Sequence, residues 1–460
     1  MHKVTIENEI LYAENGDKLS DVLLRNGKYV DHPCAGKGTC KKCTVLVNGQ
    51  PQLSCQYVID SDIDVSLPQK YEISSETGAE NSGTKTSEMC FVLDIGTTTL
   101  ALALVSLDEK SIIKTVTRIN PQKMYGADVI SRIEYCRNNS LLPLQKVLID
   151  EINSMLSLFE VTDDLCMFVA GNTTMLHIFF GVDPSTIGVA PYKPVFTKSQ
   201  EKSGTELGLC GISTACSLPC ISSFVGADIV AGLNYVEFPA EGKYNLLIDL
   251  GTNAEIALFS ENGVICTSAA AGPCFEGANI SCGMGASEGA IYAYSKSGYK
   301  SIGNAYPKGI CGTGLVDVIA ELLYTEIDET GYMNCEVFEI ADGVSLTQGD
   351  VRQYQLAKSA VFSAVETLLK YKKITHDDIG KVYISGGFSS KINISNAVKT
   401  GLIPKPFEGK CTAINNSSLL GTVKYACDEN RIDSFISDSE YVDLSSSSDF
   451  SALFIENMMF

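Results

Sequence analysis

Residues 92–98 read Val-Leu-Asp-Ile-Gly-Thr-Thr, and residues 247–253 read Leu-Ile-Asp-Leu-Gly-Thr-Asn. Both copies consist of two apolar residues, an aspartate, an apolar residue and then Gly-Thr. Each copy is typical of a buried strand that runs into a turn, and an alternating apolar pattern follows both. Because internal repeats are a signal of fold, this one predicts two related halves of a single large α/β domain.

The repeated segments suit a nucleoside triphosphate held between two lobes. Glycine lets the backbone approach a phosphate, amide N–H groups and the Thr hydroxyl donate to its oxygens, and the aspartate holds hydrated Mg²⁺ or orients the attacking water. One such segment is also common as ordinary turn chemistry, so the pairing carries the interpretation. The candidate residues are Asp94, Gly96, Thr97 and Thr98, and Asp249, Gly251, Thr252 and Asn253.

Three further glycine-containing turns follow apolar runs, at Gly171-Asn172-Thr173, Gly312-Thr313-Gly314 and Gly386-Gly387. Taken singly, the turns at 312–314 and 386–387 are better interpreted as ordinary loops. The sequence has no GxxxxGK[ST] segment and no Rossmann G-x-G-x-x-G after a strand, which excludes the P-loop class. His177 lies in an apolar run, so we interpret it as a hydrogen-bonded core histidine.

Four cysteines, Cys34, Cys40, Cys43 and Cys55, follow the pattern C-x5-C-x2-C-x11-C. Thiolates hold a [2Fe–2S] cluster with three ligands on one loop and a later fourth, and small residues between them let backbone N–H groups approach the sulfurs. A structural zinc site, which usually has two close ligand pairs, and unrelated buried thiols are the alternatives. Only Cys40 and Cys43 form such a pair, so the spacing favours iron–sulfur over zinc.

Six other cysteines fall into two groups, which could be second metal sites. They are Cys210, Cys216 and Cys220, and Cys266, Cys274 and Cys282. Neither group has a matching spacing or a fourth ligand. Because free cysteine is among the most buried residue types, we interpret both groups as structural.

The pattern divides the chain into three parts. Residues 1–68 predict a small α+β unit, with a strand at 4–10 and a turn at Asn48-Gly49. Residues 69–89 hold too few large apolar groups to offset their ordering entropy and predict a flexible linker. Residues 90–460 predict the large domain, with lobes at approximately 90–240 and 241–460.

Composition excludes several classes of function. The 460 residues have a formal net charge of −20, which repels phosphate backbones and argues against a nucleic-acid partner. No run reaches the roughly 18 apolar residues of a membrane span, and the first residues lack the layout of a signal peptide. Seventeen cysteines fit a compartment where thiols stay reduced. We therefore expect a cytoplasmic protein without a membrane partner.

Taken in order, these segments resemble the ATP-dependent reductive activators of corrinoid proteins, over about residues 28–427. The segments are CAGKGTCKKC, LSCQ, LDIGTTT, NPQKMYGADVISRI, VAGNTTM, GVAPYKPVF, LIDLGTNAEIAL, GPCFEGANISCGM, GICGTGLVD and ISGGFSS. The resemblance implies an N-terminal α+β ferredoxin-like domain of the β-grasp type. It also implies a large α/β ATPase domain of two related lobes, which is actin-like and ribonuclease H-like.

Site roles follow from this resemblance, position by position. Cys34, Cys40, Cys43 and Cys55 would bind the [2Fe–2S] cluster. Asp94 and Asp249 would lie in the two phosphate motifs and serve ATP and Mg²⁺. Gly386 and Gly387 would match the adenosine motif, and the turns at 171–173 and 312–314 would lie at the cleft.

The resemblance further implies an activity and its partners. An electron from the cluster would return a corrinoid protein from Co(II) to Co(I) for methyl transfer, with an external low-potential donor resupplying it. A plant-type cluster has a reduction potential near −400 mV, and corrinoid Co(II)/Co(I) couples generally lie lower. The electron transfer is therefore uphill and needs ATP. A homodimer is a further expectation, although this chain lacks the extra domain that longer members use to dimerise. A redox-sensing phosphotransferase of the sugar-kinase type and a plain electron carrier are alternatives.

Overall fold

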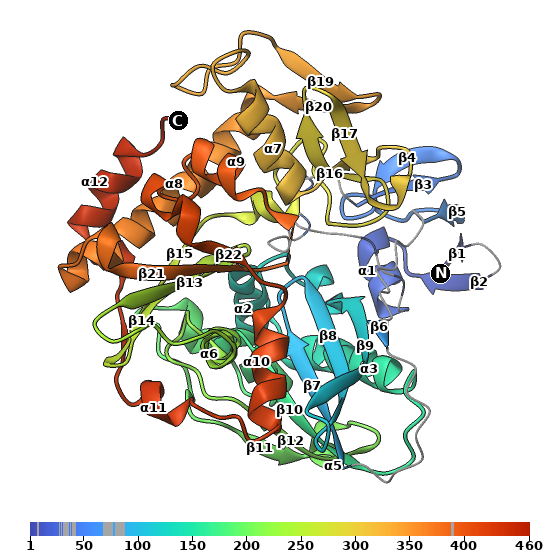
Figure 1. Ribbon diagram of the computed structural model, residues 1–460. Coiled ribbons are helices and arrows are strands. Elements are labelled where there is room, and N and C mark those ends of the chain that lie inside the picture. Colours follow the sequence, from blue (N-terminus) through green and yellow to red (C-terminus); the bar gives the residue numbers. More distant parts are fainter. Residues whose placement is uncertain are drawn as a thin grey trace. The chain divides into compact units, whose positions relative to one another are not determined.

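The computed structural model describes residues 1–6, 9–26, 28, 30, 36, 38, 43–67, 77–78, 88–387 and 391–460 (Figure 1). Two compact units make up the chain, Met1–Ser217 and Leu218–Phe460. Among the described residues, no helix combines the length and the apolar character that crossing a bilayer requires.

The N-terminal part of the first unit is a five-stranded mixed sheet with one helix. Its elements are β1 (His2–Ile6), β2 (Glu9–Ala13), α1 (Leu19–Arg25), β3 (Thr44–Val47), β4 (Gln50–Leu53) and β5 (Ile63–Ser66). The sheet order is β2-β1-β5-β3-β4, with β1 parallel to β5 and the other pairs antiparallel. This order is that of a β-grasp fold. Its core consists of alternate strand residues and the apolar face of α1.

Two local predictions for this part have different outcomes. The turn at Asn48-Gly49 is confirmed, since both residues have positive φ, 50° and 75°, and join β3 to β4. The single strand predicted at 4–10 is wrong, because β1 ends at Ile6 and β2 begins at Glu9, its antiparallel partner. A period of two continues through such a reversal, so it does not reveal the turn.

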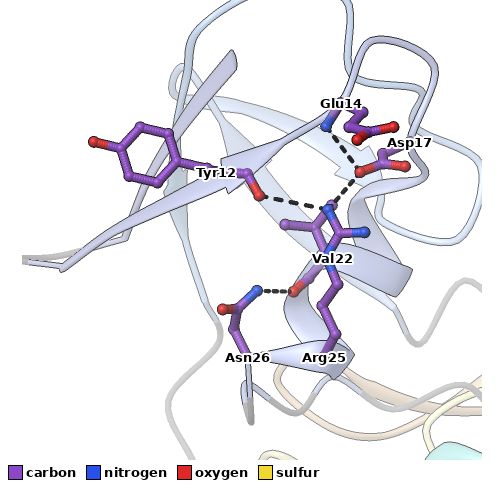
Figure 2. A network of polar contacts seen from close by, with 6 residues as sticks. All are labelled: Tyr12, Glu14, Asp17, Val22, Arg25 and Asn26. Carbon is purple, nitrogen blue, oxygen red and sulfur yellow. Dashed lines mark hydrogen bonds and ion pairs between the residues drawn. The ribbon is translucent and has the colours of Figure 1, made fainter. Parts of the chain in front are cut away.

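Polar contacts fasten α1 to the hairpin before it (Figure 2). The Arg25 guanidinium contacts Asp17 Oδ2 at 2.5 Å and the carbonyl oxygen of Tyr12 at 3.4 Å. Asp17 also accepts from the Glu14 amide at 2.9 Å. The pKa of Asp17 is lowered, most by this backbone bond and next by the hydrogen bond from Arg25. The last turn of α1 is therefore tied to the end of β2.

Among the described residues of the predicted linker, residues 77–78 and Met89 lie in strands. Thr77–Gly78 forms β6, which pairs antiparallel with Thr115 and Lys114 of β9. The flexible linker predicted at 69–89 stays a prediction, because residues 69–76 and 79–87 lie outside the described residues. A short edge strand such as β6 needs backbone pairing and no apolar core of its own.

The rest of the first unit is a seven-stranded sheet in the order β11-β12-β10-β7-β8-β9-β6. Its strands are β7 (Met89–Ile95), β8 (Thr99–Ser106), β9 (Ser111–Ile119), β10 (Leu165–Gly171), β11 (Glu201–Ser203) and β12 (Ile212–Ser217). Its helices are α2 (Val129–Asn138), α3 (Leu142–Leu156), α4 (Thr173–Phe179) and α5 (Gly204–Leu207). Strands β7, β8 and β9 form an antiparallel meander, and β10 and β12 extend it in parallel.

The second unit has a six-stranded sheet in the order β22-β21-β13-β14-β15-β23. Its strands are β13 (Tyr244–Leu250), β14 (Ala254–Ser260), β15 (Gly263–Ala269), β21 (Ile379–Ser385), β22 (Cys411–Ala413) and β23 (Ser439–Tyr441). Two small sheets add β16 (Ala290–Ser295), β17 (Gly298–Ser301), β18 (Gly309–Ile310), β19 (Val337–Ala341) and β20 (Val344–Thr347).

Helices of the second unit lie on both faces of its main sheet (Figure 1). They are α6 (Ala227–Tyr235), α7 (Gly312–Leu322), α8 (Gln348–Lys372), α9 (Ile394–Lys399), α10 (Ser417–Ala426), α11 (Asp433–Ile436) and α12 (Ser448–Glu456). Helix α8 packs on β14 and β15, α12 packs on α8, and α6 packs on β13 and α10. Alternate residues of β13 contact different layers: Leu246 and Ile248 join the core that includes α8, and Leu247 meets α6.

The two sheets confirm the repeat predicted from the sequence. Strands β12-β10-β7-β8-β9 of the first unit and β22-β21-β13-β14-β15 of the second have the same order, the same antiparallel meander and the same parallel extension. This arrangement is that of a ribonuclease H-like fold used twice. The lobe boundary predicted near residue 240 stays a prediction, and the packing groups α6 with the second unit.

Close packing of α6 against α10 depends on small residues. A Cβ at Gly421 would lie 1.7 Å from the carbonyl oxygen of Ala231, and one at Gly232 would lie 2.8 Å from Leu247 Cδ2. A side chain at either position is incompatible with the observed helix separation. The two glycines therefore fix the distance between α10, α6 and the sheet.

We predict that Gly421→Ala lowers the free energy of unfolding by about 1–3 kcal/mol, because α10 must move away from α6. Gly409→Ala is the matched control, since its Cβ would meet nothing within 4 Å. Urea unfolding of the full chain measures both variants. Equal midpoints for the two variants would contradict the packing argument.

Candidate functional site

The first repeated segment forms a tight hairpin between β7 and β8. The Gly96 amide donates to the carbonyl oxygen of Thr99 at 2.9 Å, and a Cβ at Gly96 would lie 2.6 Å from that oxygen. Asp94 is half-buried near the end of β7, opposite Ala101. Gly96 therefore closes the turn, and its amide is used within the hairpin.

Two buried side chains donate hydrogen bonds to carbonyl groups of this hairpin. Asn120 Nδ2 donates to the Gly96 oxygen at 2.8 Å, and Arg132 Nη2 donates to the Thr97 oxygen at 2.6 Å. A trans peptide points its N–H opposite to its C=O. The amides of Thr97 and Thr98 therefore point away from the buried Asn120 and Arg132 side chains, as a phosphate-binding turn requires.

Arg132 is a residue of this site that sequence reasoning missed. It is fully buried on α2, where Nε donates to the Gly126 oxygen at 3.0 Å and Nη1 donates to Gln122 Oε1 at 3.2 Å. Its positive charge lies directly behind the hairpin. The segment around it was part of the family resemblance, but nothing in a helical pattern marks one arginine as an anchor for a distant turn.

The turn at 171–173 lies beside this hairpin. Strand β10 runs parallel to β7, with Ala170 opposite Asp94 and Gly171 opposite Ile95. Asn172 caps α4 by accepting from the Met175 amide, and its Nδ2 donates to Thr97 Oγ1 at 3.1 Å. The hydroxyl of Thr97 is thereby oriented by α4.

The second repeated segment forms the equivalent hairpin between β13 and β14. The Gly251 amide donates to the Asn253 oxygen at 3.0 Å. The Thr252 hydroxyl donates to Glu276 Oε2 at 3.0 Å, and Glu276 ends the short 3-10 helix η3 (Pro273–Glu276). Glu276 is a second residue that the sequence interpretation did not single out.

Acidic side chains gather around Asp249 within the second unit. Glu255 lies directly opposite Asp249 in the β13–β14 pair. Burial raises the pKa of Glu255 well above its ordinary value, and the nearby charges of Asp228 and Asp249 raise it further. Ser268 Oγ contacts Glu255 Oε1 at 3.4 Å. Such a group of carboxylates is electrostatically prepared for a cation, since a cation would relieve the repulsion between them.

The turn at 386–387 lies beside the second hairpin. Ser385 is opposite Asp249 in the parallel pairing of β21 with β13, and Gly386 follows with φ +116°. A Cβ at Gly386 would lie 2.2 Å from the Leu250 carbonyl oxygen, whereas a Cβ at Gly387 would meet nothing within 4 Å. Gly386 is needed for packing, and Gly387 faces open space. The next three residues, 388–390, lie outside the described part.

The same glycine contact occurs in both units. In the first unit, Gly171 has φ +158°, and its Cβ would lie 2.8 Å from the carbonyl oxygen of Ile95, which follows Asp94. In the second, Gly386 meets the carbonyl oxygen of Leu250, which follows Asp249. The turns at 171–173 and 386–387 are therefore structurally equivalent, a relation the sequence comparison did not reveal.

Gly312, Thr313 and Gly314 begin α7 and are all buried. A Cβ at Gly312 would lie 2.2 Å from the Phe275 oxygen, and one at Gly314 would lie 2.2 Å from the Ile291 oxygen. The Thr313 hydroxyl donates to the Tyr292 oxygen at 2.8 Å. These contacts give the three residues a packing role that fastens α7 to η3 and β16.

Two of the four predicted cluster ligands are in the described part. Cys43 and Cys55 are buried, and their Sγ atoms lie 3.3 Å apart. Gly36 and Gly38, from the loop that carries the other two, have φ values of +80° and +76°. Cys34 and Cys40 lie outside the described residues. Two adjacent buried thiols and left-handed glycines fit an iron–sulfur cluster held by a wrapped loop.

Gln56 is a further residue that the sequence interpretation did not single out. Its Nε2 donates to the Gly36 oxygen at 2.7 Å and lies 3.6 Å from Cys55 Sγ. It ties the cysteine loop to the segment of the last ligand. The other cysteines form no group of three metal-ligating side chains among the described residues. In both further groups some thiols are at least partly accessible, and Cys210 is exposed, so burial does not account for all of them.

His177 is a core histidine, as predicted. It is fully buried on α4, and its ring Nδ1 lies 2.7 Å from the Thr173 oxygen. The Val195 amide donates to its Nε2 at 3.1 Å. Burial lowers the pKa of His177. The ring is neutral in this arrangement, with the proton on Nδ1 donated to Thr173.

Two models of known protein families match adjacent parts of this chain. A model described as the RACo middle region matches residues 89–241, and a model described as the C-terminal domain of RACo, the ASKHA domain, matches residues 243–460. The two matches cover well over half of the chain. The chain belongs to the RACo family. An ASKHA domain is the actin-like ATPase fold that the resemblance implied, and its two related halves are those that the repeat predicted.

Two curated relatives of this RACo-family chain have names that refer to corrinoid activation or to a corrinoid protein. It is 29% identical over 376 residues to the corrinoid activation enzyme RamQ of Eubacterium limosum, covering 72% of this chain and 63% of that protein. It is 26% identical over 389 residues to the [Co(II) methylated amine-specific corrinoid protein] reductase of Methanosarcina barkeri, covering 75% and 71%. The chain thus spans less than two thirds of the length of RamQ.

A solved structure confirms the fold over the full length of the chain. It is titled reductive activator for corrinoid, iron-sulfur protein, with a TM-score of 0.74, 24% identity, and coverage of 100% of this chain and 98% of that one. The actin-like fold class predicted from the sequence is therefore confirmed.

We predict that Gly387→Ala raises the Kd for ATP by about tenfold or more and leaves stability unchanged, because the added methyl enters the open space expected to hold adenosine. Gly386→Ala is the comparison variant and lowers both affinity and stability, since its methyl would collide with β13. Calorimetric ATP titration and thermal unfolding measure the two effects. Unchanged ATP affinity in Gly387→Ala would remove this turn from the nucleotide site.

We predict that Glu255→Gln stabilises the nucleotide-free, Mg²⁺-free protein increasingly as the pH rises from 4.5 toward neutrality. The pKa of Glu255 is raised in the folded state, so its favourable contribution is complete below the unfolded value of 4.5 and is lost as the pH rises through the folded value. Glu255→Gln has no carboxyl group at this position, so it loses no such contribution to stability over this pH range. Urea unfolding at several pH values tests this, with the exposed Glu261→Gln as control. A difference from wild type that does not change with pH would refute it.

Proposed function

We propose that this protein is an ATP-dependent reductive activator of a corrinoid protein. It returns the cobalt of its partner from Co(II) to Co(I), by one electron, so that methyl transfer can resume. The observation that carries this proposal is the pairing of two equivalent Asp-x-Gly-Thr hairpins, one in each unit, in a chain of the RACo family. The names of the curated relatives support the corrinoid substrate.

The residues of the first hairpin bind phosphate in this proposal. Their carbonyl groups are held by Asn120 and Arg132, so the amides of Thr97 and Thr98 are preorganised as donors and cost little reorganisation when an anion arrives. The Thr97 hydroxyl is oriented by Asn172. The buried Arg132 charge adds attraction for the polyphosphate from behind the turn.

In this proposal, residues of the second hairpin bind the Mg²⁺ ion and orient the attacking water. Asp249 and Glu255 supply carboxylate oxygens, the ligands that hydrated Mg²⁺ prefers. Thr252 is held by Glu276 and positions the turn. Asp94 and Asp249 are the residues proposed to act directly in hydrolysis, by holding Mg²⁺-bound water or orienting the attacking water.

The cysteine loop holds the redox group. Cys34, Cys40, Cys43 and Cys55 would hold a [2Fe–2S] cluster, which supplies a single low-potential electron when bound. Gln56 keeps the loop closed against Cys55. An external low-potential donor, a homodimeric state and a cytoplasmic location complete the proposal.

ATP drives the transfer only through differential affinity. A shortfall of about 150 mV corresponds to roughly 3.5 kcal/mol for one electron. Nucleotide can offset such a gap only if the two conformations of the protein differ in affinity for it and for the cobalt partner. We propose that nucleotide binding shifts the protein from one of these conformations to the other.

We predict that Co(I) absorbance appears at least about tenfold faster with ATP than without it, when the reconstituted protein, a reductant and a Co(II) corrinoid carrier are mixed. Asp249→Asn removes the ATP effect, and Cys55→Ser removes Co(I) formation. Cys210→Ser, at an exposed thiol outside the motif, serves as control and behaves like wild type. Equal rate and extent with and without ATP would reject the coupling. Turnover of ATP that requires a small hydroxylated compound would favour a sugar kinase instead.

A further inference from the structure

An exposed apolar loop lies on the first unit, between α4 and β11. We define it as residues 189–195, which read Val-Ala-Pro-Tyr-Lys-Pro-Val. Val189, Tyr192 and Val195 are 44%, 46% and 63% exposed. Elsewhere between residues 88 and 217, the exposed large apolar side chains are Ile130, Leu142 and Leu158, which are well separated in sequence. Scattered exposed residues are normal, but three within seven residues indicate an interaction site.

The apolar loop has a defined shape. The Tyr192 amide donates to the Val189 oxygen at 2.7 Å, which closes a tight turn. Tyr192 has φ +55°, an uncommon conformation for a bulky residue, and its ring is half-exposed. Pro191 and Pro194 restrict the backbone further. A loop ordered before binding loses little entropy when a partner covers it.

The C-terminal end of the apolar loop and the residue after it, Phe196, contact His177. Phe196 stacks on the imidazole with ring centroids 4.0 Å apart and an interplanar angle of 5°. The Val195 amide donates to Nε2 of the same ring at 3.1 Å. Phe180 meets Phe196 edge-on. These contacts hold the base of the loop while its apolar residues face outward.

The same histidine connects the apolar loop to the phosphate hairpin. His177 lies on α4, whose cap Asn172 donates to Thr97 Oγ1 at 3.1 Å. A single seven-residue helix is therefore bonded to the hairpin at its start and to the loop at its end. A shift of the hairpin on binding phosphate would be passed through α4 to the loop.

The charge of this region differs from that of the chain. Between Asp183 and Glu201 the sequence contains Lys193 and Lys198 and no acidic residue, although the whole chain has 55 acidic residues and a net charge of −20. Both lysines are exposed. An apolar surface with basic residues beside it complements an apolar patch with carboxylates at its rim.

We propose that the apolar loop is a docking surface for the corrinoid protein, whose matching surface is apolar with acidic residues at its rim. Tyr192 and Val195 are the apolar anchors, and Lys193 pairs with the acidic rim. This proposal rests on the proposed function, because the partner is the one that function requires. His177 is a positioning residue that keeps the loop in register with the phosphate hairpin.

The test measures binding of the full chain to a Co(II) corrinoid carrier by calorimetry, with ATP affinity measured in parallel. Tyr192→Ser and Val195→Ser each raise the Kd for the carrier by about tenfold or more, because each removes apolar area from the contact. Lys193→Glu also raises the Kd for the carrier, by a larger factor at low salt than at high salt. ATP affinity stays at the wild-type value in all three variants, since the substituted side chains lie outside the two hairpins.

Leu142→Ser is the matched control, because Leu142 is 70% exposed on the same unit outside the apolar loop. Its affinity for the carrier equals that of wild type. If wild type binds the carrier and the three loop variants bind equally well, the docking proposal is overturned and the proposed function stands. If wild type does not bind the carrier at all, both are overturned.

Discussion

The absence of a side chain at two equivalent glycines is the constraint on which both halves of the molecule depend. Gly171 and Gly386 each approach the carbonyl oxygen of the residue that follows the motif aspartate, at distances no Cβ could tolerate. The contact lets a parallel strand end directly beside the Asp-x-Gly-Thr hairpin. Because it occurs twice, it brings a second turn to each hairpin, Asn172 in one unit and Gly387 in the other.

The two hairpins occupy equivalent places in their sheets, but their electrostatics differ. Behind the first lies a buried guanidinium with amide and carbonyl partners, which favours anionic phosphate. Across from the second lies Glu255, whose pKa is raised by burial and by Asp228 and Asp249, so this side favours a cation. Mg²⁺-ATP carries both charges. In the proposed function, the first hairpin therefore serves the phosphate and the second serves its metal.

The sequence predicted those features that depend on local pattern. The repeat, the Asn48-Gly49 turn and the core position of His177 follow from apolar spacing and turn chemistry, and the structure contains all three. It did not reveal the break between β1 and β2, because a period of two continues through a hairpin. Arg132, Gln56 and Glu276 were also missed, since each acts through a partner distant in sequence. Two cluster ligands, Cys34 and Cys40, lie outside the described residues, so their placement stays a prediction.

The length of α4 determines how closely the nucleotide side and the apolar loop can be coupled. His177 lies five positions after Asn172, which is about 7.5 Å of helix rise. Over so short a distance a helix moves as a rigid rod, so its two bonded ends cannot shift independently. A neutral histidine suits the second end, because only the neutral ring can accept from the Val195 amide while donating to Thr173. Stacking on Phe196 adds an apolar contact that fixes the ring plane. The β7–β8 hairpin and the exposed loop are therefore bonded to the same short helix.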